Sequence, residues 1–151
     1  MKTANILTNE NKFNLLAGRV PLLLNRFLSQ QFKAKGLLLT REQWSVLAVL
    51  WKTDGCSQQL IADTTSRDKP SVTRLIDNLV KEGYVTRESH ETDRRTNLIY
   101  LTQKGKDVKP LVMEVVDETI MLSTEGLNEE EIDIIRNAFQ LIFNNIKNYV
   151  K

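Results

Sequence analysis

Two adjacent arginines follow an aspartate in the segment DRRTNLIYLTQKG, residues 93–105, just before an alternating apolar run. If this segment forms the tip of a β-hairpin, Arg94 or Arg95 can enter the minor groove of DNA, whose negative potential attracts a guanidinium group. The alternative is a solvated turn in which Asp93 pairs with an arginine, and such exposed ion pairs contribute little stability. The surrounding sequence has to distinguish between these two interpretations.

A second group of side chains suited to binding DNA lies on a predicted helix that begins at Asp68 or Lys69 and stops at Gly83. Apolar side chains at helical spacing predict its buried stripe: Val72, Leu75, Ile76, Leu79 and Val80. The polar face carries, near the N-terminus, the candidate DNA contacts Lys69, Ser71, Thr73 and Arg74. There an arginine can read guanine or bind a phosphate, whereas hydroxyl groups and lysine more often contact phosphates. The alternative is ordinary helix surface, which is our interpretation of Asp77 and Lys81.

A shorter helix is predicted immediately before this one. Ser57 is suited to cap its N-terminus, and the polar run TTSR, residues 64–67, ends it. Two short helices joined by a polar turn are typical of a helix-turn-helix, in which the second helix reads the major groove. Gln58 and Gln59 lie in the first turn of the shorter helix and are candidates for contacts to the DNA backbone.

The segment after Gly83 changes from helical to alternating periodicity. Residues 84–87 and 97–101 are rich in β-branched and aromatic side chains, and a polar segment separates them. We therefore expect a β-hairpin with a long tip that carries the two arginines. Thr102 is then predicted to cap a further helix, which kinks or restarts near Pro110.

Two amphipathic helices are predicted on the N-terminal side. The first runs over residues 13–32, and Pro21 either kinks it or marks where it begins. Thr40 and Gln43 can form a capping box that starts the next helix, and Gly55 is suited to the left-handed position that closes it.

The last predicted helix follows the capping residue Asn128 and is too apolar to face only water. Its apolar side chains are spaced alternately by three and four, which is the seam of a coiled coil: Ile132, Ile135, Phe139, Ile142, Ile146 and Tyr149. Leu23 and Phe27 give the first helix a comparable apolar face. Because the first helix is basic and the segment leading into the last is acidic, charge also favours their packing together in a homodimer.

Composition excludes several classes of site. With one cysteine, Cys56, and one histidine, His90, in 151 residues, the chain has no internal disulfide and almost no ligands for zinc. It lacks a nucleophile elbow, a phosphate loop and a cluster of metal ligands, so we expect no enzyme, no cofactor and no metal. We see neither a signal peptide nor a membrane span, which predicts a cytoplasmic protein. Cys56 has no basic neighbours, which favours an inert thiol over a redox switch.

The segment DKPSVTRLIDNLVKEGYVTRESHETDRRTNLIYLTQKG, residues 68–105, joins the polar recognition face to a hairpin with an Asp-x-Arg and Leu-Thr-x-x-Gly pattern: Asp93, Arg95, Leu101, Thr102 and Gly105. In this combination and in the order of its elements, nearly the whole chain resembles the MarR (multiple antibiotic resistance regulator) family of bacterial winged helix-turn-helix transcription factors. The resemblance implies a mainly α-helical fold with a small β-hairpin wing, and a homodimer whose N- and C-terminal helices interlock. It implies double-stranded DNA as partner, regulation by a small anionic or phenolic effector, and Asp93 as the residue that orients a wing arginine.

These elements predict how the chain is divided by function. Residues 40–102 form the winged helix-turn-helix DNA-binding domain, and residues 1–39 and 103–151 form a helical dimerisation region. The expected function is a homodimeric regulator that binds an inverted-repeat operator, acting as a repressor released by the effector. The alternative is a protein-interaction module built on the same fold. The polar recognition face with Arg74 and the paired arginines favour DNA.

Overall fold

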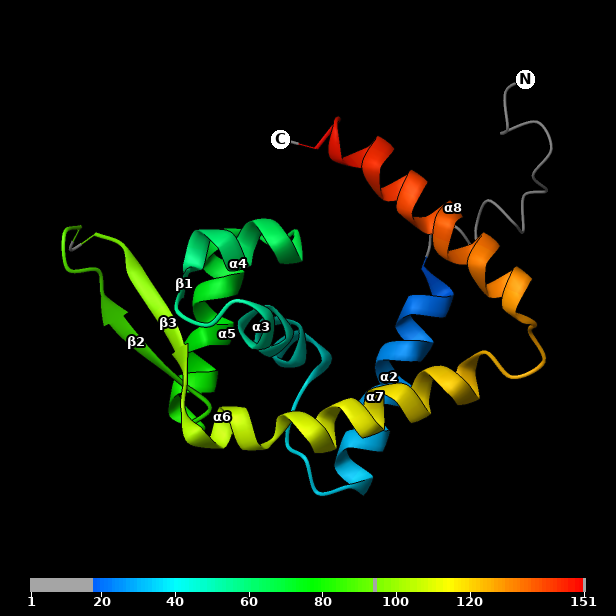
Figure 1. Ribbon diagram of the computed structural model, residues 1–151, viewed down its shortest axis with the longest axis horizontal. Helices are drawn as coiled ribbons and strands as arrows, with labels where there is room; N and C mark the ends of the chain where they lie inside the picture. Colours follow the sequence, from blue (N-terminus) through cyan, green and yellow to red (C-terminus); the bar gives the residue numbers. More distant parts are fainter. Residues whose placement is uncertain (1–17, 94, 151) are drawn as a thin grey trace. The chain divides into compact units, whose positions relative to one another are not determined.

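The computed structural model describes residues 18–93 and 95–150, which form helices and a small sheet (Figure 1). The chain divides into two compact units, Met1–Val116 and Asp117–Lys151. Its elements follow in the order α2 (Arg19–Ala34), α3 (Arg41–Lys52), β1 (Cys56–Ser57), α4 (Gln58–Thr65), α5 (Lys69–Lys81), β2 (Val85–Ser89), β3 (Asn97–Leu101), α6 (Gln103–Asp107), α7 (Lys109–Ser123) and α8 (Glu129–Lys147). The fold is mainly α-helical with a hairpin wing, as the sequence predicts.

The predicted helix starts are present as side-chain caps, which satisfy amide groups that no carbonyl within the helix can reach. Thr40 Oγ1 accepts from Gln43 N at 3.1 Å, and the Gln43 side chain accepts from Thr40 N at 2.9 Å, which confirms the capping box. The helices α4, α6 and α8 are capped by the side chains of Ser57, Thr102 and Asn128.

Both prolines that interrupt predicted helices lie in first turns. α2 begins at Arg19, so Pro21 lies where a missing backbone N–H removes no helical hydrogen bond. α6 ends at Asp107 and α7 begins at Lys109, which confirms the predicted restart near Pro110. The start of the predicted first helix lies outside the described residues.

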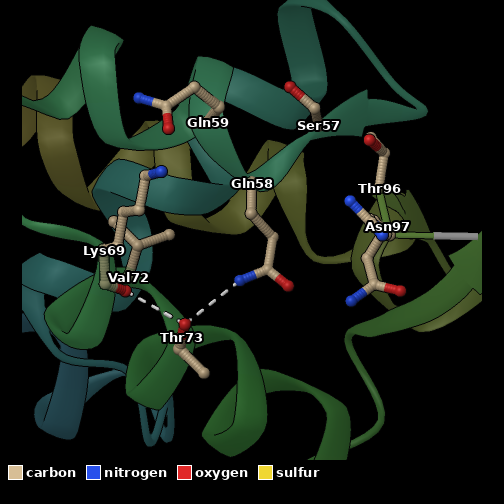
Figure 2. Close-up of a pocket in the computed structure, with 9 residues that line it drawn as sticks. Ser57, Gln58, Gln59, Lys69, Val72, Thr73, Thr96 and Asn97 are labelled. Atoms are coloured by element: carbon tan, nitrogen blue, oxygen red, sulfur yellow. Dashed lines mark hydrogen bonds between the residues drawn. The ribbon is translucent and has the colours of Figure 1, made fainter. Parts of the chain in front are cut away.

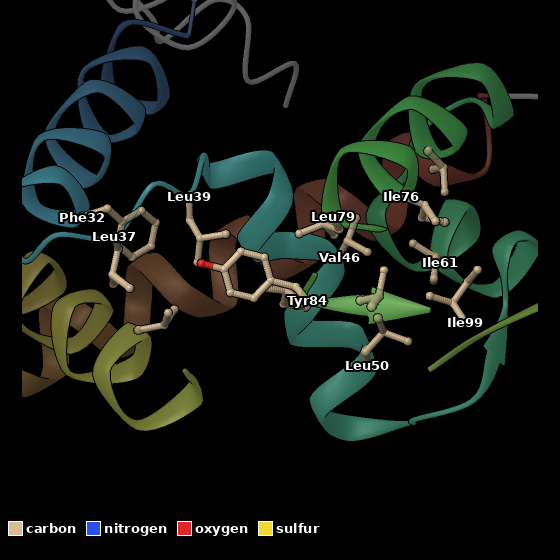
Figure 3. Close-up of a cluster of buried hydrophobic side chains, with 14 of the residues drawn as sticks. Phe32, Leu37, Leu39, Val46, Leu50, Ile61, Ile76, Leu79, Tyr84 and Ile99 are labelled. Carbon is tan, nitrogen blue, oxygen red and sulfur yellow. The ribbon is translucent and has the colours of Figure 1, made fainter. Parts of the chain in front are cut away.

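The hydrophobic core of the first unit includes buried side chains from α3, α4, α5 and the sheet (Figure 3), among them Leu47, Leu50, Ile61, Ile76, Leu79 and Ile99. Burying one such side chain contributes about 1.5–3 kcal/mol, so this cluster fixes how α4 and α5 lie against α3. The predicted stripe of α5 is confirmed at Val72, Ile76 and Leu79. The prediction for Val80 is wrong, because this side chain is 39% exposed. At 3.6 residues per turn it lies about 70° from the centre of the stripe.

The sheet has three antiparallel strands in the order β1-β3-β2, one strand more than the predicted hairpin. β2 and β3 form that hairpin, with Val85 opposite Leu101 at its base. β1 adds to β3 through the pair of Cys56 and Ile99, just before α4 begins. Two residues are too short a run to show an alternating pattern, so the sequence did not predict this strand.

Gly55 lies in the turn between α3 and β1, and the prediction that it closes α3 is wrong. α3 ends at Lys52, and Gly55, with a φ of 71°, follows the two intervening residues. Asp54 Oδ1 accepts from Gly55 N at 3.0 Å and from Leu101 N at 2.8 Å, which fastens the turn to β3. The left-handed residue is therefore needed where the chain approaches β3, and there the ring of Tyr100 leaves no room for a Cβ.

Thr102 joins the base of the wing to the helices. Its hydroxyl donates to Gly83 O at 2.6 Å and accepts from Gly105 N at 3.1 Å. Trp51 Nε1, on α3, donates to Gly105 O at 2.9 Å. Gly105 is buried, and a Cβ at this position would overlap the carbonyl oxygen of Tyr84. The spacing of Thr102 and Gly105 in LTQKG thus allows α3, the turn before β2 and the start of α6 to come into contact.

In the single chain, the apolar seam of α8 is exposed to solvent. None of its residues is buried, and the exposed fraction of the seam within the helix ranges from 39% at Ile132 to 60% at Phe139. The prediction that Tyr149 ends the helical seam is wrong, because α8 ends at Lys147 and Tyr149 lies in the turn that follows. On α2, Leu23 is 59% exposed and Phe27 is half-buried. Among the described residues, no helix combines the length and apolar character needed to cross a membrane.

We expect Gly105→Ala to destabilise the protein by about 1–3 kcal/mol, because the added Cβ meets the backbone of Tyr84, which cannot move aside. The sign is informative, since the same change in an unhindered helix stabilises by about 1 kcal/mol. Urea unfolding measures the difference. Lys106→Ala, at the exposed neighbouring position, is the control and should change little. A Gly105→Ala protein as stable as the wild type would contradict the close approach.

Candidate nucleic-acid interface

The first turn of α5 is fixed by its capping residue. Asp68 Oδ1 accepts from Ser71 N at 2.8 Å, and Pro70 occupies the same turn. This hydrogen bond lowers the pKa of the Asp68 carboxyl, which stays ionised at neutral pH and suits the positive end of the helix dipole. Lys69 and Arg74 lie exposed on the first two turns of the helix.

A groove lies between the first turns of α4 and α5 and the wing (Figure 2). Side chains from these three elements line it: Ser57, Gln58, Gln59, Lys69, Val72, Thr73, Arg95, Thr96 and Asn97. Candidate contacts from three different elements therefore meet here: Gln58 of α4, Lys69 and Thr73 of α5, and Arg95 of the wing. Two of the described lining residues are cations and none carries a carboxylate, so the groove attracts anions.

Gln58 connects α4 to α5 within this groove. Its Nε2 donates to Thr73 Oγ1 at 3.3 Å, and Thr73 Oγ1 donates to Lys69 O at 3.0 Å (Figure 2). Gln59, the adjacent residue, donates instead to Asp63 Oδ1 on its own helix at 2.7 Å. The two neighbouring glutamines thus differ, because only the bond of Gln58 depends on the packing of two helices.

Asp93 organises the tip of the wing. Its Oδ1 accepts from Arg95 N at 2.9 Å, and its Oδ2 accepts from Thr96 Oγ1 at 2.9 Å. The Arg95 amide, followed by the Thr96 hydroxyl, lowers the pKa of the Asp93 carboxyl. Because both carboxylate oxygens are engaged, Asp93 holds the backbone of the turn and leaves the Arg95 side chain exposed. Arg94 lies outside the described residues.

Asp77, assigned from the sequence to ordinary helix surface, has a specific partner. Its Oδ1 lies 2.7 Å from Arg87 Nη2, which joins α5 to β2. The two side chains remain 54% and 30% exposed, so the pair contributes little stability. The positive charge of Arg87 does compensate the carboxylate of Asp77, which would otherwise repel an anion beside α5. No sequence pattern predicts this pair, because one partner lies on a helix and the other on a strand.

The single cysteine and histidine supply no reactive centre. Cys56 is buried in β1, and burial raises the pKa of its thiol, which therefore stays protonated at neutral pH. His90 Nδ1 lies 3.0 Å from Thr92 Oγ1 in the wing. Across residues 18–93 and 95–150, no group of His, Cys, Asp and Glu side chains is arranged to hold a metal ion.

The profile of the MarR family matches residues 39–96, from the start of α3 to the wing tip. The chain is 27% identical over 120 residues to YybA, an uncharacterized HTH-type transcriptional regulator of Bacillus subtilis, covering 78% of this chain and 80% of the relative.

Solved structures extend this likeness to the three-dimensional fold. A MarR transcriptional regulator from Methanosarcina mazei matches with a TM-score of 0.77 at 26% identity, covering 89% of this chain and 99% of that one. A mutant MarR from Escherichia coli, complexed with operator DNA, matches with a TM-score of 0.79, covering 87% of this chain and 93% of that one. At 21% identity this second likeness concerns the fold alone.

The family profile covers the helix-turn-helix and most of the hairpin, and the relatives extend the match to most of the chain. Members of this family are transcriptional regulators rather than enzymes. In the order of its elements, in the geometry of helix and wing, and in these matches, the chain is similar to the winged helix-turn-helix transcriptional regulators of the MarR family.

Proposed function

We propose that this regulator binds specific sequences of double-stranded DNA through the groove between α4, α5 and the wing. One observation carries the proposal: Gln58, Lys69, Thr73 and Arg95 converge in a groove whose described lining contains cations and no carboxylate. A groove with cations and no carboxylate among its described lining residues suits the phosphate backbone of DNA. The fold likeness to a MarR complexed with operator DNA supports the same reading.

In this proposal α5 and the wing have different tasks. The N-terminal half of α5 enters the major groove, where Arg74 reads a base edge and Lys69 and Ser71 contact phosphates. Arg94 and Arg95 at the wing enter the minor groove. Asp93 orients this part of the wing through the Arg95 amide and does not touch DNA, because phosphate repels a carboxylate.

The active form is proposed to be a homodimer in the cytoplasm. Its interface uses the seam of α8 and the apolar face of α2 around Leu23 and Phe27, which the single chain leaves wholly or partly exposed. A two-fold dimer places its recognition helices on one side of the duplex, so the operator is an inverted repeat with half-site centres about one helical turn apart.

The regulator is further proposed to repress transcription by blocking promoter access and to release DNA when it binds a small anionic or phenolic effector. Such an effector acts by favouring a dimer whose two wings and recognition helices are differently spaced. Its identity has to come from a metabolite screen.

The division of tasks predicts different losses for two arginine variants. Arg74→Ala should cost about 1–3 kcal/mol on the operator and relax selectivity at one position per half-site. Arg95→Ala should weaken all DNAs alike and lower the slope of log affinity against log salt by about one unit per phosphate charge lost, doubled in a dimer. Salt titrations on operator and random DNA measure both effects. Lys81→Ala, on the same helix, is the control, and equal losses of Arg74→Ala on both DNAs would contradict base reading.

The dimer predicts a strong effect of charge in the α8 seam. The double variant Ile135→Asp, Ile142→Asp should lose both the dimer and DNA binding, because two unpaired charges would be buried in the interface. Light scattering reports the assembly, and circular dichroism reports the fold. Asn137→Asp with Asn144→Asp adds the same charge to the polar face of α8 and should remain dimeric. A folded monomer of the seam variant that binds operator normally refutes this interface.

Effector control predicts a reciprocal effect. If an aromatic carboxylate weakens operator binding by some factor, saturating operator must weaken binding of the carboxylate by the same factor. Calorimetric titration of the compound into free protein and into the protein–operator complex measures both. Equal affinities in the two titrations, for every compound that binds, argue against this mechanism.

A further inference from the structure

The bond between Gln58 and Thr73 fixes the polarity of the Gln58 amide. The only hydrogen of the Thr73 hydroxyl is donated to Lys69 O at 3.0 Å, so the hydroxyl oxygen can only accept from a further partner. The atom of Gln58 that faces it at 3.3 Å is accordingly Nε2, since Oε1 in that place would be repelled. Figure 2 shows Oε1 on the other side of the amide, towards Asn97 and the groove.

A carbonyl oxygen that faces this groove does not suit a phosphate. Phosphate oxygens are acceptors, and an acceptor directed at them is repelled. In the major groove, by contrast, the exocyclic amino groups of adenine and cytosine are donors. Oε1 and the remaining N–H of Nε2 together form the acceptor and donor that match N6 and N7 of adenine.

We propose that Gln58 reads one base in each half-site, with adenine preferred and cytosine second, and that Thr73 is the positioning residue that holds the amide in this orientation. The inference rests on the proposed function, because it requires the side of the groove formed by α4 and α5 to face the major groove of DNA. It changes the expected role of Gln58 from a contact with the DNA backbone to a residue that determines sequence specificity.

The test selects binding sites from a random DNA pool with the full-length protein and then measures affinity for all four bases at each position. In the wild type we expect one position per half-site that prefers adenine to guanine and thymine by about 10- to 100-fold. Gln58→Ala should abolish the preference at that position and leave the others unchanged. Gln103→Ala is the matched control, because Gln103 is also an exposed glutamine that donates to an aspartate of its own helix, Asp107, at 2.8 Å, but lies outside the lining of the groove, and its profile should equal the wild-type profile.

Variants of Thr73 separate positioning from a merely structural role. Thr73→Val keeps the shape of the side chain but removes the hydroxyl. The Gln58 amide can then rotate by about 180°, which exchanges the positions of Nε2 and Oε1. Guanine, which presents two acceptors, should then gain on adenine by about tenfold at the position read by Gln58. Thr73→Ser restores the hydroxyl and should restore the wild-type profile. A merely structural role would weaken binding to all sequences and leave the profile unchanged, and circular dichroism checks the fold of each variant.

Each result has a distinct meaning. Loss of one base preference in Gln58→Ala, together with a gain of guanine in Thr73→Val, is the result expected. If Gln58→Ala leaves every preference intact, or weakens binding to all sequences alike, the inference is overturned and the proposed function stands. If Gln58→Ala behaves as expected but Thr73→Val keeps the wild-type profile, the positioning role is overturned. If the wild type selects no sequence at all, the proposed function itself fails.

Discussion

The geometry of the wing depends on the hydrogen bonds around Thr102. Its hydroxyl satisfies Gly83 O and Gly105 N at once, while Trp51 of α3 donates to Gly105 O. Apolar burial of the strands would hold the sheet against the helices, but it is not directional and would not fix where along the chain the wing begins. These directional bonds do, and the missing side chain of Gly105 allows the backbone of Tyr84 to come close enough for them to form.

With the base of the wing fixed, the charges around the groove are arranged so that its cations remain available. Asp68 and Asp93 are ionised, and the amide hydrogen bonds that lower the pKa of each carboxyl also compensate its charge. Asp77 is compensated by Arg87 across the gap between α5 and β2. Lys69 and Arg95 therefore face the groove without a carboxylate among its described lining residues, and this is the electrostatic condition for attracting a phosphate backbone.

The C-terminal unit presents a different physical problem. It spans Asp117–Lys151, which is below the size at which a chain buries a stable core without help. Its main helix, α8, accordingly keeps every residue exposed when the single chain is considered. In our proposal a second copy of the chain covers this seam. The same interface that removes the seam from water also sets the distance between the two recognition helices, so dimerisation and DNA recognition are coupled. An effector that alters this distance would then alter operator affinity.

Much of the fold could be predicted from local sequence, because helix caps and periodicity depend on residues within about one turn of each other. Thr40 with Gln43, the stripe of Val72, Ile76 and Leu79, and the hairpin after Gly83 are predictions of this kind that the structure confirms. The candidate face of α5 followed from the same periodicity.

Three features needed the packed molecule. β1 is two residues long and exists because β3 lies beside it. The ion pair of Asp77 with Arg87 and the bond of Gln58 to Thr73 each join two different elements. The partners of each pair come into contact only when the buried cluster of α3, α4, α5 and the sheet has formed. A local sequence pattern therefore cannot predict these contacts. The candidate polar face of α5 is thus a property of the sequence, whereas the groove and the orientation of the Gln58 amide arise from tertiary packing.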